Sequence, residues 1–215
     1  MHAGTMVPGV EVFLQRYPRM TLLPIAGREV LLEGELQFSA TAANHPEISD
    51  AYRLRIAVPE EFPSALPVVE ELDHKIPRNG DFHVNPGGSL CLGSPLRLLL
   101  KLSKVPTLPG YASHCLVPYL YAISHKLQFG GKLPFHELDH GRPGEIADYV
   151  ELFGLQRREQ AERAIRLLGL KKRIANKSPC PCECGRPLGK CVFNKKLAKM
   201  RRLASRSWFR ALSTR

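Results

Sequence analysis

The sequence has no apolar run approaching the roughly 20 residues that a membrane-spanning helix needs. Its first residues lack the pattern of a secretion signal, which is a charged start, an apolar stretch and a small-residue cleavage site. It contains neither an internal repeat nor a low-complexity tract. We therefore expect no transmembrane segment, no secretion signal and no repeat array, and we expect the chain to work in the reducing cytoplasm.

Acidic residues are nearly absent from the last part of the chain. Residues 171–215 hold 14 lysines and arginines and one acidic residue, Glu183. Residues 1–170 hold 17 lysines and arginines and 19 acidic residues. The basic isoelectric point of about 9.6 therefore belongs to the tail and says nothing about the main body.

The chain has 215 residues and six cysteines. This length fits one medium-sized domain with a long appendage, or one domain plus a mini-domain. In a reducing compartment, cysteines suggest metal binding or catalysis before disulfides.

The hydrophobic pattern predicts an α+β fold. A short helix is expected in 10–20, and strands in 28–40, 51–59 and 66–72, joined by short turns as an antiparallel meander. A polar, irregular segment, 73–95, follows. Helices are then predicted in 111–128, where Pro118 starts or kinks the helix, and in 144–155 and 156–170, with a break near Gly154. We expect the helices to pack on one face of the sheet.

The stretch "HVNPGGSLCL" (83–92) places Cys91 between two leucines, after a turn-forming run. Taken alone, such a cysteine is a small buried hydrophobe. At the end of a polar, glycine-rich loop it can instead be a nucleophile.

Two runs in order resemble ubiquitin-conjugating enzymes. "YRLRIAVPEEFPSALPVV" (52–69) is similar to the strand region of that family, and "DFHVNPGGSLCL" (81–92) is similar to its His-Pro-Asn motif and active-site cysteine. The resemblance covers roughly residues 10–155. Val84 stands where the family has proline, and the spacing from Asn85 to Cys91 is slightly shorter than expected.

The resemblance implies a UBC-like fold and a thioester-carrying cysteine, Cys91. Asn85 is then the candidate donor to the oxyanion of the tetrahedral intermediate, and His83 braces the loop or donates as well. Leu90 and Leu92 are expected to anchor the segment in the core while the sulfur faces outward. The implied partners are an activating enzyme and a ubiquitin-like modifier, and the acceptor is an amine, commonly a lysine.

Residues 128–154 are similar to a segment of bacterial ubiquitin-conjugating-like proteins found in anti-phage and modification operons. This resemblance implies a prokaryotic member whose target is a protein such as a cyclic-nucleotide synthase. If this loop folds over Cys91, Asp139 or His140 can orient or deprotonate the attacking amine. A solvated loop is the alternative. Cys115, among apolar residues of a predicted helix, is expected to lie in the core.

"SPCPCECGRPLGKCVFN" (178–194) holds four cysteines within twelve residues, enough for a tetrahedral zinc site. The stretch resembles the SEC-C zinc motif, whose last ligand position is occupied here by Val192. We expect structural zinc on Cys180, Cys182 and Cys191, with Cys184 replacing the missing ligand. Reversible disulfide chemistry, or a reduced cysteine-rich loop, is the alternative.

The tail "NKKLAKMRRLASRSWFRALSTR" (194–215) has apolar residues at helical spacing and predicts one basic amphipathic helix. Nucleic acid, an anionic membrane surface and an acidic protein surface are candidate partners. The remaining alternative is a helix packed on its own zinc knuckle.

The predicted division is a UBC-like domain in 1–155, a helical linker in 156–177, the knuckle in 178–194 and the basic tail in 195–215. The expected function is transfer of a ubiquitin-like modifier through Cys91. The alternatives are a catalytically inactive binding or adaptor module, and a nucleic-acid-associated protein that acts through its tail.

Overall fold

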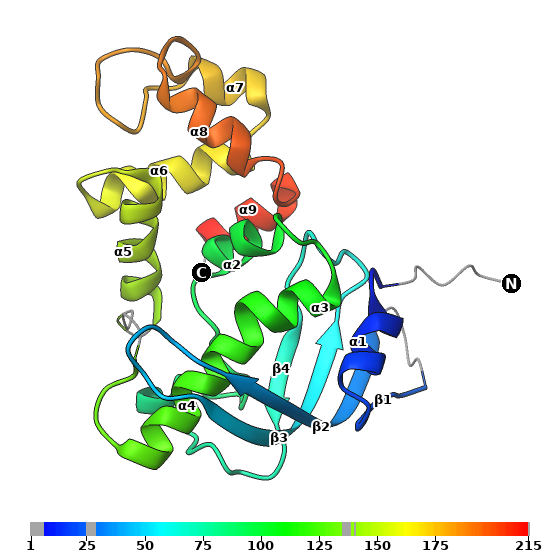
Figure 1. The fold of residues 1–215 in the computed structure, drawn as a ribbon. Helices are drawn as coiled ribbons and strands as arrows, with labels where there is room; N and C mark the ends of the chain where they lie inside the picture. Colours follow the sequence, from blue (N-terminus) through cyan, green and yellow to red (C-terminus); the bar gives the residue numbers. More distant parts are fainter. Residues whose placement is uncertain (1–6, 25–28, 135–138, 140, 215) are drawn as a thin grey trace, which may run out of the picture. The chain divides into compact units, whose positions relative to one another are not determined.

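The computed structural model describes residues 7–24, 29–134, 139 and 141–214. The chain divides into two compact units, Met1–Glu137 and Leu138–Arg215 (Figure 1). The first unit contains α1 (Val10–Arg16), β1 (Met20–Leu22), β2 (Val30–Ala40), β3 (Ile48–Val58), β4 (Val68–Glu71), α2 (Pro95–Leu102), α3 (Leu108–Tyr111) and α4 (Val117–Phe129). The second contains α5 (Gly141–Phe153), α6 (Arg158–Gly169), α7 (Lys172–Lys177), α8 (Phe193–Met200) and α9 (Arg206–Ser213).

Within the described residues, four strands form one antiparallel sheet in the order β1-β2-β3-β4. The longest pairing joins β2 to β3 from Val30↔Val58 to Ala40↔Ile48. The predicted α+β class and antiparallel meander are confirmed. The sequence did not predict β1, which is three residues long and pairs with β2 at the edge of the sheet.

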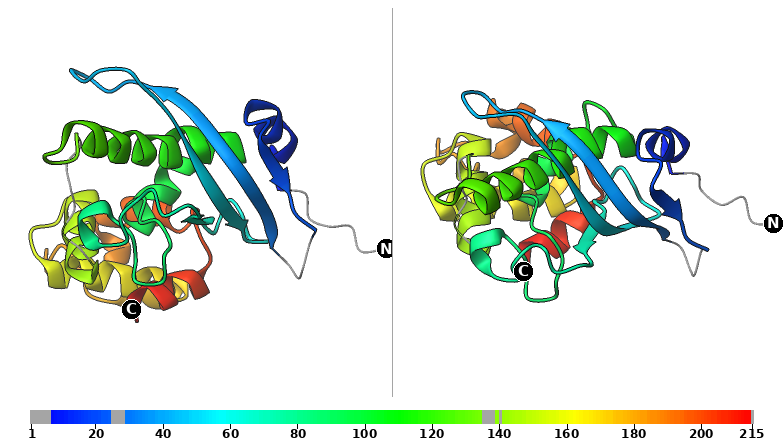
Figure 2. Two further views of the ribbon diagram at one scale, coloured as in Figure 1. Left: turned by 90° about the horizontal axis from the view of Figure 1, so that it is seen from below. Right: turned by 60° about the horizontal axis from the view of Figure 1, so that its bottom comes forward.

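Strand β3 has the strict alternation that its sequence predicts. Its apolar side chains, which include Leu54 and Ile56, are buried, while Arg53 and Arg55 point to the opposite face and pair there with Glu33. Helix α4 contacts β2 and β3 (Figure 2). The sheet therefore has one face covered by a helix and one face that carries charged pairs.

The segment predicted as a single helix in 111–128 consists of three joined pieces. Helix α3 passes into a π-helical turn, Ala112–Leu116, and then into α4. Pro118 lies in the first turn of α4. Proline is tolerated there because the backbone N–H groups of a first turn have no hydrogen-bond partner within the α-helix. Among the described residues, no helix has the length and apolar character needed to cross a bilayer.

In the second unit, the break expected near Gly154 separates α5 from α6. Gly154 has φ 61°, a left-handed conformation that ends a helix readily when the residue is glycine. Helix α5 contacts α6 and belongs to the second unit. The division of the chain after residue 137 therefore falls earlier than the domain boundary at 155 that the sequence predicts.

The prediction of one continuous tail helix is wrong. Helix α8 ends at Met200, and α9 begins after Ser205, whose side chain accepts a hydrogen bond from the Trp208 amide at 3.2 Å. Such a cap favours a new helix start at that position. The apolar residues of the two helices point inward: Leu197, Met200, Phe209 and Leu212 are all buried.

Candidate functional site

The segment that carries Cys91 is joined to the edge of the sheet. The Leu90 amide donates to the Val69 carbonyl of β4 at 2.8 Å, and Ser89 forms an antiparallel bridge with Glu70. The irregular segment after β4 thus returns beside that strand. This pairing fixes the backbone on the amino-terminal side of Cys91.

A short hairpin places the predicted site residues side by side. The Cys91 amide donates to the His83 carbonyl at 2.7 Å, the Asn85 amide donates to the Ser89 carbonyl at 2.9 Å, and Val84 lies opposite Leu90. Side chains alternate between the two faces of such a ribbon. Because Val84 and Leu90 are only 8% and 7% exposed, the opposite face of the ribbon is the one turned away from the core.

Asn85 and the turn after it are held by local bonds. Asn85 Nδ2 donates to Ser89 Oγ at 3.0 Å, and the Gly88 amide donates to the Asn85 carbonyl at 2.8 Å. Gly88 has φ 86°, which favours glycine, and the Arg78 guanidinium lies against it. Among the described residues, no side chain or distant backbone atom comes within 4 Å of a Cβ placed on Gly87.

His83 is half-buried and has φ 52°, in the left-handed region. Its carbonyl accepts from Cys91, as described, and its amide donates to the Gly80 carbonyl at 2.8 Å. The backbone of His83 is therefore a fixed corner at which the chain enters the hairpin.

Two further residues brace this region and were missed by sequence reasoning. Tyr119 of α4 donates its hydroxyl to the Phe82 carbonyl at 2.8 Å. Burial raises the pKa of Tyr119, and the nearby Cys91 sulfur adds to that rise. Glu71 is 3% exposed, and its carboxylate accepts the amides of Asp73 and Ile76 at 2.9 and 3.3 Å. The Tyr119 contact joins residues 37 apart in the sequence and carries no local sequence pattern.

The two cysteines of the first unit differ sharply. Cys91 is half-buried, and the flanking Leu90 and Leu92 both pack against the hydrophobic core. Cys115 is 2% exposed, and burial raises the pKa of its thiol to about 11. The expectation that Cys115 belongs to the core is confirmed.

The other predicted catalytic residues lie elsewhere in the chain. Asp139 belongs to the second unit and is exposed. Its backbone carbonyl packs against Gly144, at a position that a Cβ on that residue would overlap. His140 lies outside the described residues.

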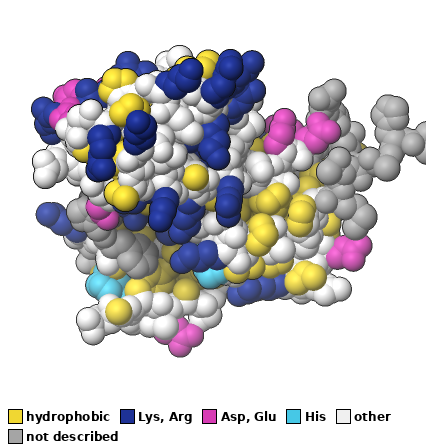
Figure 3. All heavy atoms as spheres, turned by 90° about the horizontal axis from the view of Figure 1, so that it is seen from above, with side chains coloured by type: hydrophobic (Ala, Val, Ile, Leu, Met, Phe, Trp, Pro, Cys, Tyr) yellow, Lys and Arg dark blue, Asp and Glu magenta, His cyan; other side chains and the backbone are white. Residues whose placement is uncertain are grey.

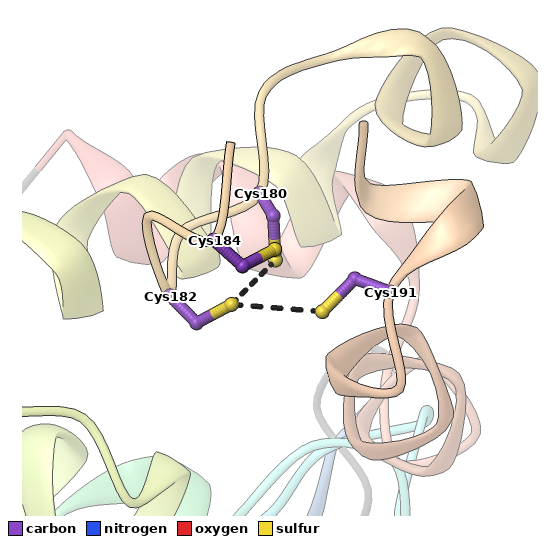
Figure 4. Close-up of side chains that lie close together, drawn as sticks. All are labelled: Cys180, Cys182, Cys184 and Cys191. Atoms are coloured by element: carbon purple, nitrogen blue, oxygen red, sulfur yellow. Dashed lines mark hydrogen bonds between the residues drawn. The ribbon is translucent and has the colours of Figure 1, made fainter. Parts of the chain in front are cut away.

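The cysteine cluster in 180–191 has the geometry of a metal site. The Sγ atoms of Cys180, Cys182, Cys184 and Cys191 all lie within 4.8 Å of one another (Figure 4). Cys182 Sγ is 3.1 Å from Cys180 Sγ and 3.5 Å from Cys191 Sγ. Four sulfurs at the usual Zn–S distance of about 2.3 Å from one tetrahedral ion would be roughly 3.8 Å apart. The four sulfurs can therefore bind a metal ion after small adjustments.

Backbone bonds hold this cluster in a knuckle. The Cys180 amide donates to the Arg186 carbonyl at 3.1 Å, and Pro179 bridges Pro187, so the two ends of the loop run side by side. The Phe193 amide points at Cys191 Sγ, 3.4 Å away. Gly185 has φ 73°, which lets the chain turn tightly between the cysteines.

Hydrogen bonds favour the thiolate form of one cysteine of the cluster, Cys184. A hydrogen bond from the Arg186 backbone amide, followed by one from Cys182, lowers the pKa of Cys184 to about 6. Burial raises the pKa of Cys180 and of Cys182. A positive metal ion among the sulfurs would oppose the effect of burial, because zinc binds the deprotonated form.

The structure thus brings His83, Asn85 and Cys91 onto one hairpin and collects the four tail cysteines in one cluster. No family model, curated protein or solved structure matches the chain.

Proposed function

We propose that the chain is a transferase that carries the acyl group of a ubiquitin-like modifier as a thioester on Cys91 and passes it to an amine. The observation that supports this most is the pairing of the 83–91 hairpin. Val84 and Leu90 are buried on one face, so Cys91 and Asn85 belong to the face turned away from the core. The structure has a helix, an antiparallel meander, the cysteine segment and then helices, which is the order that the hydrophobic pattern predicts.

The chemistry needs few groups. The Cys91 thiolate attacks the carbonyl carbon of a thioester on an activating enzyme, a new C–S bond forms, and the enzyme's cysteine leaves as a thiolate. An acceptor amine then attacks the same carbon. The C–N bond forms, the C–S bond breaks, and the amine loses its proton to solvent or to a base near the site.

Asn85 is suited to stabilise the oxyanion of both steps. An amide nitrogen carries two hydrogens, and the bond to Ser89 Oγ uses one of them. The second can donate to negative charge that develops beside the sulfur. Gly87, with open space around it, can let an extended peptide tail approach the backbone.

The second part of the proposal is a structural zinc ion in the knuckle. Four sulfur donors, two of them in buried residues, suit zinc and complete a tetrahedral set. No position would then remain for a substrate. The metal would stabilise the loop around the cysteines, which contains no regular secondary structure longer than one short turn within 178–192.

The test uses a synthetic peptide ending in Gly-Gly as a C-terminal thioester, incubated with the full-length, zinc-loaded protein. We expect a mass adduct that dithiothreitol removes. Cys91→Ala should form no adduct, and Cys91→Ser should form a slower, dithiothreitol-resistant ester. Cys115→Ala is the matched control and should behave as the wild type, because its sulfur is buried.

A reducible adduct that persists in Cys91→Ala would contradict the proposal. If the wild type forms no adduct but binds a ubiquitin-like protein without covalent linkage, the chain is a binding module. Mapping the adduct by peptide mass spectrometry separates Cys91 from the four knuckle cysteines.

A further inference from the structure

A recess of about 550 Å³ lies in the second unit, between α6, the end of α7 and the metal knuckle. Arg166 and Leu167 line it from α6, and Lys177 lines it from α7. The paired ends of the knuckle loop, Pro179 and Pro187, form another wall. All of these elements belong to one compact unit.

The lining of the recess is strongly cationic. Arg163, Arg166, Lys177 and Arg186 border it, against one carboxylate, Glu183. That carboxylate is already bound by Arg157 and Arg163. Within the described part of the chain, no carboxylate pairs with Arg166 or Lys177, and both residues are exposed. The recess thus offers two positive charges to a ligand.

The same recess has an apolar surface. Leu167, which is only 8% exposed, lines the recess, and Pro179 and Pro187 line it as well. An apolar surface beside unpaired cations suits a ligand that combines a flat organic group with a phosphate. Nucleotides have this chemistry, and an unstacked base can also lie on a guanidinium plane.

The charge continues beyond the recess. Residues 138–215 hold 19 of the 31 lysines and arginines but seven of the 20 acids. Figure 3 shows how lysine and arginine side chains gather on one face, with few acidic side chains among them. The recess has room for one nucleotide, and further cations lie around it. This arrangement favours a nucleic acid strand, which carries several phosphates, over a single nucleotide.

We propose that this recess binds single-stranded nucleic acid, with phosphates on Arg166 and Lys177 and an unstacked base against Leu167 and the two prolines. A membrane surface fits less well, because an interfacial helix must expose its apolar face. The apolar residues of α8 and α9, including Leu197 and Phe209, are buried. This inference does not depend on Cys91.

The experiment measures binding of a short fluorescent oligouridylate to the full-length, zinc-loaded protein by anisotropy over a range of salt. The double variant Arg166→Gln/Lys177→Gln removes the two recess cations. Its matched control, Lys195→Gln/Arg206→Gln, removes two exposed cations of α8 and α9 that do not line the recess. Both variants change the net charge equally, and zinc content measured by mass spectrometry shows whether the knuckle is intact.

For the recess variant we expect at least a tenfold weaker affinity. The slope of log K against log salt should fall by about 1.4, since each phosphate contact to a single strand contributes about 0.7. The control should lose much less affinity. Equal losses in the two double variants, or no binding to the wild type at physiological salt, would overturn the proposal.

Two competitors separate the other ligands. Polyglutamate carries the charge without bases, and vesicles containing phosphatidylserine present anionic headgroups. We expect neither to displace the oligouridylate at an equal concentration of negative charge. If either one displaces it and also binds the recess variant more weakly than the control, the recess belongs to that ligand instead.

Discussion

At the scale of single residues, burial distinguishes two cysteines that look alike in the sequence. Cys91 and Cys115 are both followed directly by a leucine. Cys91 is half-buried on a hairpin, whereas Cys115 is in the core with its thiol pKa raised to about 11. At neutral pH the Cys115 thiol is therefore almost entirely protonated and is a poor nucleophile.

Asn85 gives the sharpest residue-scale prediction. Asn85→Ala should slow acyl transfer from Cys91 by roughly 10² to 10³-fold, because removing one oxyanion donor has that effect in other enzymes. Single-turnover transfer from the preformed thioester to free lysine measures this rate. Ser89→Ala is the control: it removes the acceptor that orients the amide but keeps the donor, so its loss should be smaller.

An Asn85→Ala variant with a transfer rate within twofold of the wild type would show that Asn85 does not stabilise the oxyanion. A loss of thermal stability as large as the loss of rate would indicate a structural role. The melting temperature of each variant must therefore be measured beside the rate.

At the scale of elements, the long alternating strand was predictable and the short or context-dependent elements were not. From Tyr52 to Val58, β3 buries every second residue, a pattern that the sequence shows directly. β1 has three residues and depends on its pairing with β2. Helix α2 begins at Pro95 directly after a glycine- and proline-rich run. The sequence analysis predicts no element for its leucines, although proline suits a first helical turn.

The candidate sites also differ in how far the sequence predicts them. Spacing alone grouped the four knuckle cysteines, because all their ligand positions are local in sequence. The pairing of Leu90 with Val69, the Tyr119 contact to Phe82 and the recess beside α6 depend on segments that are further apart in the chain. A single sequence carries no local pattern for such contacts.

The knuckle gives the element-scale prediction. A strong chelator should unfold the loop around Cys180–Cys191, because the proposed zinc ion would supply the folding free energy of this loop. Amide hydrogen exchange should rise in residues 178–192 and stay unchanged in β3. Adduct formation at Cys91 should continue. Inductively coupled plasma mass spectrometry should find one zinc per chain before chelation and none after it.

Cys191→Ser should reproduce the effect of the chelator, since that residue supplies one of the buried sulfurs. Val192→Ala, at the neighbouring exposed position, serves as the control and should retain the metal. A reduced wild type without zinc, or a knuckle whose exchange does not respond to chelation, would rule the metal site out.

At the scale of the whole molecule, the two units divide the charge. The first unit holds 12 lysines and arginines and 13 acidic residues, whereas the second holds 19 lysines and arginines and seven acidic residues. The proposed nucleophile lies in the nearly neutral unit, and the metal site and cationic recess lie in the basic one. Each chemistry can therefore be altered by substitution without changing the residues of the other.

A polar network in the first unit predicts how stability depends on pH. Partial burial raises the pKa of Asp50, but hydrogen bonds from Lys75, Ser124 and the Ala51 amide outweigh it, so the pKa lies below its ordinary value. Ser124 donates to Asp50 Oδ2 at 2.7 Å and links β3 to α4. A carboxyl with a lowered pKa stabilises the fold above the unfolded-state value near 4. This stabilisation is lost as the pH falls through the lower folded-state value.

Asp50→Asn should therefore lower the free energy of unfolding at pH 7, and the gap to the wild type should close as the solution is acidified below about pH 4. Urea unfolding of zinc-loaded protein, followed at several pH values by the fluorescence of its tyrosines and tryptophan, measures the gap. A gap of constant size between pH 7 and pH 3 would contradict the assignment.

Cys180 belongs to both proposed sites: its sulfur is part of the metal cluster, and the residue also lines the cationic recess. Where zinc holds this shared wall in place, its binding strengthens the binding of nucleic acid, and by thermodynamic reciprocity the nucleic acid strengthens zinc binding by the same factor. Zinc starvation in the cell would then release bound nucleic acid without any change in the abundance of the protein.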